Sequence, residues 1–136
     1  MLDTRLVFNK YMLICTYMVF YMFDLIRINK SLSDETRLRI LNLLLGRECC
    51  VCEVMQALSI SQTRASRNLN ILHNADLVKL RKDGLWSLYS INNDSRIKYL
   101  PDVLSAIEKA LKDNDVSNKD RERLNKTVRR GVGCTL

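Results

Sequence analysis

Three of the chain's five cysteines lie within four consecutive positions, in the stretch RECCVCEVMQAL. Cys49, Cys50 and Cys52 open a segment with helical periodicity, and we expect their sulfurs to converge at its first turn. The helix dipole there is expected to lower the thiol pKa and to favour the thiolate. Three thiolates without a neighbouring histidine suit a three-coordinate soft ion such as As(III) or Sb(III). A tetrahedral zinc site needs a fourth ligand, which Cys15, Cys134 or a partner chain would have to supply.

Other roles for the thiols have different requirements. Single buried cysteines pack well as small apolar residues. Three of them between Glu48 and Glu53 favour ion binding or thiol redox chemistry instead. Cys49 and Cys52 also form a C-x-x-C pair, but a thioredoxin-like enzyme places that pair in a βαβ unit. Here it lies between predicted helices, so we expect no enzyme, and a redox-sensing protein remains the alternative.

Size and charge restrict the class of protein further. The chain has 136 residues, which suits one domain with its own core, and 47% of them are hydrophobic. The formal net charge of +7 permits a polyanionic partner, with nucleic acid as the first candidate and an anionic membrane surface as the second. An odd number of cysteines with uneven spacing indicates reduced thiols and a cytoplasmic protein. We expect no organic cofactor.

The apolar periodicity predicts a mainly helical protein with one small β-hairpin. Helices are predicted over residues 34–46 with Ser33 as the N-cap, 50–58, 61–73 and 94–114. The two middle helices, joined by a short polar turn, form a helix-turn-helix pattern. Residues 77–91 alternate around Asp83-Gly84, which is a strong hairpin signal. This order is the winged helix-turn-helix arrangement.

The predicted helix after Ser61 has an acid-free polar face. Arg pairs with guanine, Gln and Asn pair with adenine, and a helix N-terminus favours a phosphate. The hairpin tip adds positive charge for contacts to the DNA backbone or the minor groove. The predicted DNA-binding residues are Ser61, Gln62, Thr63, Arg64, Ser66, Arg67 and Asn70 on the helix, with Arg81 and Lys82 on the hairpin.

The two ends of the chain differ from this central domain, which we place at residues 24–114. Residues 1–23 form an apolar extension whose uncharged run, Tyr11–Phe23, is shorter than the ~20 residues that span a bilayer. We expect a buried or dimer-forming helix there rather than a targeting or membrane-spanning segment, although a membrane-associated regulator and Met22 as the true start both remain open. Residues 115–136 are predicted to be a basic, flexible tail. We expect a homodimer through the N- and C-terminal helices.

Residues from about Lys30 to Asn92 resemble the ArsR family of winged-helix metalloregulatory repressors. The match rests on LSDETRLRIL, ECCVCEV, SQTRASRNLNIL, ADLV and RKDGLWSLYSI. The resemblance implies a homodimer that binds operator DNA and dissociates when As(III) or Sb(III) binds a cysteine pair, which corresponds to Cys50 and Cys52. It therefore implies an arsenic-resistance repressor that acts in transcription regulation.

The chain also departs from the family pattern. Met55 stands where a third cysteine often follows the pair, and Asn68 stands where a histidine is common. The zinc-sensing branch uses Asp and His on the last helix, and His73 is the chain's one histidine. Pb(II), Cd(II) and Bi(III) remain open, because they also accept three thiolates.

Overall fold

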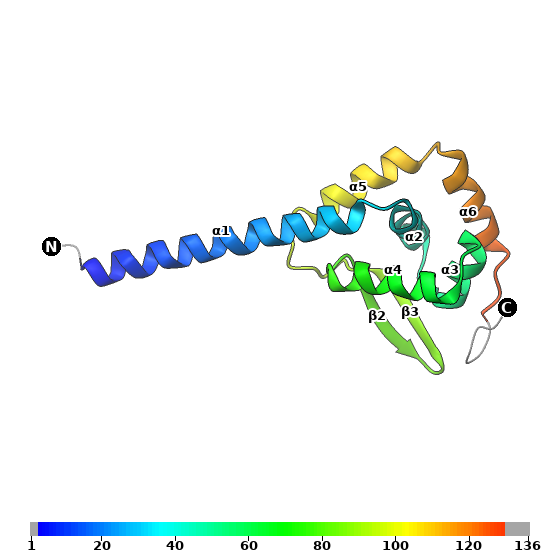
Figure 1. Cartoon of the computed structure of the whole chain (residues 1–136), viewed down its shortest axis with the longest axis horizontal. Helices are drawn as coiled ribbons and strands as arrows, with labels where there is room; N and C mark the ends of the chain where they lie inside the picture. Colours follow the sequence, from blue (N-terminus) through cyan, green and yellow to red (C-terminus); the bar gives the residue numbers. More distant parts are fainter. Residues whose placement is uncertain (1–2, 130–136) are drawn as a thin grey trace.

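The computed structural model describes residues 3–129, which form six helices and a three-stranded antiparallel sheet (Figure 1). The helices are α1 (Thr4–Leu32), α2 (Glu35–Gly46), α3 (Val51–Leu58), α4 (Gln62–Asn74), α5 (Leu100–Leu111) and α6 (Asp115–Asn125). The strands are β1 (Cys49–Cys50), β2 (Val78–Asp83) and β3 (Trp86–Ile91), in the order β1-β3-β2. The helix pair α3 and α4 is followed by the β2–β3 hairpin, so the predicted winged helix-turn-helix arrangement is confirmed.

One hydrophobic core holds α2, α3 and α4 together against the sheet. Of the periodic leucines on α2 and α4, Leu41, Leu69 and Leu72 are completely buried. Each such side chain contributes about 1.5–3 kcal/mol relative to an exposed one. This packing fixes the angle at which α4 presents its polar face to solvent.

Side-chain caps set the boundaries of the helix-turn-helix. Asp34, not Ser33, is the N-cap of α2, and its carboxylate accepts the Arg37 N–H at 3.0 Å. Ser33 instead donates to the Lys30 carbonyl at the end of α1, at 2.8 Å. Ser61 caps α4 as predicted and accepts the Arg64 N–H at 3.2 Å. The turn between α3 and α4 contains Ser59 with a φ of 55°.

The hairpin forms where Asp83-Gly84 predicts it, and Gly84 has the left-handed φ of 57° that this turn requires. Its register pairs Asp83 with Trp86 and Val78 with Ile91. The sequence analysis did not predict β1, which pairs Cys49 with Tyr89 and Cys50 with Leu88. This short strand joins the start of α3 to the β2–β3 hairpin, which is the wing of the fold.

The C-terminal part of the chain differs from the prediction in two ways. Residues 94–99 are not helical, because Asn92 and Ser95 hydrogen-bond the Asp76 carboxylate and hold the chain in turns. Residues 115–125 form α6 rather than a flexible tail. The Asp120 carboxylate on α6 is fully buried and accepts hydrogen bonds from Arg39 of α2, at 2.7 and 2.8 Å, and from Arg123 at 2.5 Å. The predicted tail residues 130–136 lie outside the described part of the chain.

The first helix runs unbroken through the predicted boundary at residue 23. Only Ile28 and Ser31 of α1 are buried, and both lie near its C-terminal end. The rest of α1 projects away from the winged domain (Figure 1). The expectation of a helix buried within its own chain is therefore wrong for this segment.

Candidate nucleic-acid interface and thiol cluster

Helix α4 exposes the polar side chains that the sequence assigns to DNA. Its buried stripe consists of Ala65, Leu69 and Leu72, which face the core with no exposed area. The opposite face is open to solvent, and in Figure 1 α4 lies on the same lower side of the molecule as the hairpin. The exposed or half-exposed residues on this face are Ser61, Gln62, Thr63, Arg64, Ser66, Arg67 and Asn70. The structure thus collects all seven predicted helix residues on one accessible surface.

Two of the polar residues near the start of α4 also hold the helix in place. Arg64 donates to the Thr36 hydroxyl of α2 at 2.8 Å. Asn68 is buried, where it donates to the Arg64 carbonyl at 2.9 Å and accepts from Arg37 at 3.3 Å. Asn68, which stands where a histidine is common in the family, therefore has a structural role in this protein. Arg67 has no such role among the contacts of the described residues and remains directed to solvent.

A hollow between the start of α2 and α4 adds a residue that the sequence analysis missed. Arg37 lines this hollow together with Thr63, Arg64 and Arg67. The Asp34 carboxylate lines it as well, and Arg37 already donates to the Ser31 and Lys30 carbonyls. A phosphate oxygen would therefore meet one carboxylate beside the three guanidinium groups. The only sequence signal for Arg37 was its place one turn after a helix start, and that is too common to single it out.

The wing is less available to DNA than its sequence indicates. Arg81 forms a bidentate pair with the Glu48 carboxylate at 3.0 and 2.5 Å and contacts Asp83 at 3.4 Å. Hydrogen bonding to Arg81 lowers the pKa of Glu48, so this carboxylate stays charged. Lys82 donates to the Ser87 hydroxyl at 2.5 Å. A phosphate would have to compete with Glu48 for Arg81.

The three clustered cysteines do not share one face. Successive residues of a strand point to opposite sides, and β1 consists of Cys49 and Cys50. Cys49 is fully buried in the main core, and its thiol contacts the Arg47 carbonyl at 3.5 Å. Cys50 and Cys52 pack together in a second buried cluster with Leu88 and Trp86. The pair is thus separated from the third predicted ligand.

The expected activation of the thiols by the helix dipole is wrong. Burial raises the pKa of the Cys49 thiol to about 12 and also raises the pKa of Cys50. Cys50 is the N-cap of α3, but its side chain is buried rather than in water. Desolvation therefore outweighs the favourable dipole.

Among the described residues, no other candidate ligand completes a site with the cysteine cluster. Cys15 is exposed on α1, whose N-terminal part lies at the opposite end of the molecule from α3 (Figure 1). Cys134 lies outside the described residues. Within residues 3–129, no three His, Cys, Asp or Glu side chains are arranged to hold a metal ion.

Comparison with known proteins identifies the fold and the family. The profile of the family described as "Bacterial regulatory protein, arsR family" matches residues 34–80, which include α3, α4 and the cysteine cluster. The arsenic resistance transcriptional regulator ArsR2 of Pseudomonas putida is 38% identical over 110 residues, which cover 77% of this chain and 93% of that protein. The chain belongs to the ArsR family. It is a winged helix-turn-helix transcriptional repressor, and the family consists of DNA-binding regulators rather than enzymes.

Two further proteins are similar to this ArsR-family repressor. A homologue of the cadmium resistance regulatory protein CadC from Staphylococcus aureus is 38% identical over 57% of this chain and 64% of its own length. A homodimeric winged helix-turn-helix domain from Mycobacterium bovis, described as a possible ArsR-family regulator, superposes with a TM-score of 0.58 at 26% identity. That match covers 69% of this chain and 83% of the other.

Within the ArsR-family fold, Glu53 links the thiol pair to the C-terminal segment. Its buried carboxylate accepts the Cys50 N–H at 2.9 Å, Arg47 at 2.8 Å and Arg129 at 3.3 Å. Burial alone would raise the pKa of Glu53, but these hydrogen bonds hold it below the usual value. Sequence reasoning missed this role. The only signal was a Glu three residues after a possible N-cap, which is the spacing of a capping box.

Proposed function

We propose that this ArsR-family protein is a repressor that binds operator DNA as a homodimer and dissociates when As(III) or Sb(III) binds its cysteine cluster. The proposal is supported by the position of the thiols. Cys50 caps α3 and Cys52 lies in its first turn, and α3 packs directly on the DNA-facing helix α4. A change at these two residues therefore acts on the helix that supports α4.

The donor set fits a metalloid in part. As(III) and Sb(III) supply a thiophilic centre that accepts up to three sulfurs, and Cys50 and Cys52 would hold it from one side of β1. Cys52 already takes part in a further interaction, which capture would have to displace. Cys49 lies on the other side of β1. It reaches the pair only if the strand releases its pairing with Tyr89.

That requirement gives a mechanical route from the thiols to both DNA-contacting elements. The whole of β1 consists of the two pairs Cys49–Tyr89 and Cys50–Leu88. Turning Cys49 toward Cys50 breaks this pairing and frees the wing strand β3 from the start of α3. The same movement pulls the Cys50 N–H away from Glu53. The helix-turn-helix and the wing would then no longer share a fixed orientation.

The homodimer in this proposal places two copies of α4 on one operator. The Mycobacterium bovis domain is homodimeric by its description. Two-fold proteins match palindromic half-sites about one helical turn apart. A regulator of this kind acts in the cytoplasm, where the winged domain meets DNA.

The test is a titration of the protein–promoter complex with arsenite, followed by fluorescence anisotropy. The full chain is used in a mild non-ionic detergent, with a phosphine reductant that carries no thiol. Arsenite should weaken promoter binding roughly 5- to 150-fold, which corresponds to a coupling of about 1–3 kcal/mol. Cys50→Ser should bind the promoter like the wild type but should not be released.

The matched control is Cys15→Ser, which removes a thiol far from α3 and should be released normally. Undiminished promoter binding at saturating arsenite rejects the metalloid proposal. Release by cadmium but not by arsenite would indicate a divalent soft-metal repressor, as the name of the Staphylococcus relative suggests for that protein. Release by peroxide alone would indicate a redox repressor.

A further inference from the structure

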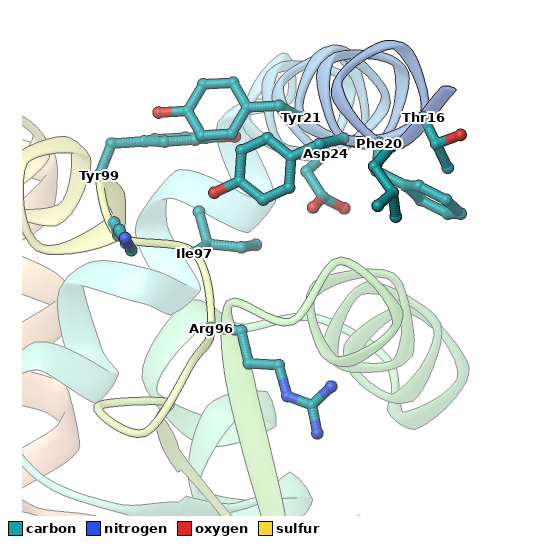
Figure 2. Close-up of a pocket in the computed structure, with 10 residues that line it drawn as sticks. Thr16, Phe20, Tyr21, Asp24, Arg96, Ile97 and Tyr99 are labelled. Atoms are coloured by element: carbon teal, nitrogen blue, oxygen red, sulfur yellow. The ribbon is translucent and has the colours of Figure 1, made fainter. Parts of the chain in front are cut away.

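The N-terminal part of α1 is an exposed apolar helix that meets the winged domain on one side, where residues between Leu13 and Asp24 line a pocket with residues 96–99. Its large apolar side chains between Leu6 and Phe23, apart from the half-buried Val7, are 46–70% exposed. The ring of Tyr21 contacts Tyr99 edge to face, with 5.3 Å between centroids, where α1 leaves the winged domain (Figure 2). The N-terminal turns of α1 project away from the winged domain (Figure 1). Soluble proteins rarely expose a contiguous apolar surface of this extent without a partner for it.

The distribution of these residues identifies the kind of partner. Every residue from Tyr11 to Phe23 is uncharged and exposed. Because a helix turns once every 3.6 residues, this run covers all sides of α1. A second copy of the chain would bury one stripe, and a helix adapted to that role keeps a polar opposite face. A helix that is apolar all round suits a medium that surrounds it.

The length of the segment matches a bilayer. Residues 6–23 rise about 27 Å along the helix axis, close to the ~27–30 Å of a hydrocarbon core. Arg5 precedes the segment, and Asp24 and Arg27 follow it as a pair at 2.9 Å. Lys10 lies about one turn inside, from where its long side chain can reach the headgroups. By length and composition, α1 can cross a membrane.

The polar groups near both ends and in the middle agree with this environment. The Thr16 hydroxyl donates to the Met12 carbonyl at 2.7 Å, so it is satisfied inside the helix. Tyr11 and Tyr21 lie toward the two ends of the uncharged run, and tyrosine is enriched where a helix meets the headgroups. We propose that residues 6–23 of α1 anchor this repressor in a phospholipid bilayer, with the winged domain on its aqueous side. This inference does not depend on the inducer.

The test is flotation of the full chain with vesicles of phosphatidylcholine and phosphatidylglycerol in a density gradient. The wild type should float with the vesicles and remain bound in about 1 M NaCl, where surface charge attraction is screened. Ile14→Arg places a charge near the middle of the segment and should reduce vesicle partitioning about 100-fold. Ala110→Arg adds the same charge at an exposed position of α5 and should float like the wild type.

Three outcomes would overturn the proposal. The first is that the wild type stays in the lipid-free fractions. This includes the case in which the wild type forms a defined oligomer that the Ile14→Arg substitution dissociates. The second is flotation that about 1 M NaCl abolishes, because it indicates adsorption through the net charge. The third is an Ile14→Arg variant that floats as well as the wild type. Promoter binding by Ile14→Arg shows that its winged domain is folded, and arsenite release of that variant tests the inducer separately.

Discussion

Replacing Asp120 by Asn should destabilise the domain by about 2–3 kcal/mol, although α6 has the composition of a solvated tail. The Asp120 carboxylate has no exposed area and accepts three hydrogen bonds from Arg39 and Arg123. Removing one partner of a buried ion pair costs ~3–5 kcal/mol. The Arg39 side chain is 19% exposed and that of Arg123 is 44% exposed, so water recovers part of this loss. An asparagine also turns an N–H donor toward the guanidinium donors.

The measurement is urea unfolding of the full chain in mild detergent, followed by circular dichroism. Glu122→Gln is the matched control, because it removes the same charge from an exposed position of the same helix. The control should stay within about 0.5 kcal/mol of the wild type. Hydrogen exchange should show that Asp120→Asn opens α6 before the rest of the domain.

A double-mutant cycle identifies the partner. Because Arg39 and Asp120 interact directly, Arg39→Ala should cost much less in the Asp120→Asn background than in the wild type. The reasoning fails if Asp120→Asn is no more destabilising than Glu122→Gln. It also fails if the two Arg39 and Asp120 effects are additive.

Two further predictions concern the proposed function. Arg67→Ala should weaken promoter binding and lower the slope of log K against log salt concentration by about one. The reason is that Arg67 is exposed on α4 and makes no internal ion pair with the described residues. An unchanged slope would show that Arg67 is not part of the interface. Release by arsenite should change little between about pH 6.5 and 8, whereas release by cadmium should weaken as the pH falls, by up to about tenfold per pH unit for each proton displaced. The difference arises because burial raises the pKa of the Cys49 and Cys50 thiols, which are therefore protonated in the free protein. Neutral arsenous acid exchanges its hydroxyls for thiol sulfur and releases water, whereas Cd²⁺ must displace protons; titrations at several pH values distinguish the two.

Local patterns were sufficient to predict the helix-turn-helix and the hairpin. The α4 stripe of Ala65, Leu69 and Leu72 follows helical spacing, and Asp83-Gly84 marks the hairpin. Both signals lie within a few residues of the structure that they specify. The predicted DNA-binding residues on α4 occupy its exposed face for the same reason.

Contacts between distant parts of the chain explain what the sequence did not reveal. The α6 helix depends on Asp120 meeting Arg39, which is 81 positions away. A two-residue strand such as β1 has no periodicity to detect, and its pairing with β3 decides that Cys49 and Cys50 face opposite ways. The same pairing brings Glu48 beside Arg81 and reduces the positive charge of the wing.

Strand β1 has both a structural role and a proposed ligand role, and this limits how the ion specificity of such a repressor can be changed. Its two backbone units carry the hydrogen bonds that hold the wing strand, and its two side chains are thiols. A substitution at position 49 or 50 therefore also acts on the connection between β3 and the start of α3. To obtain a new ion specificity in this fold, positions 49 and 50 should be kept and new ligands should be placed on α3 beyond its first turn.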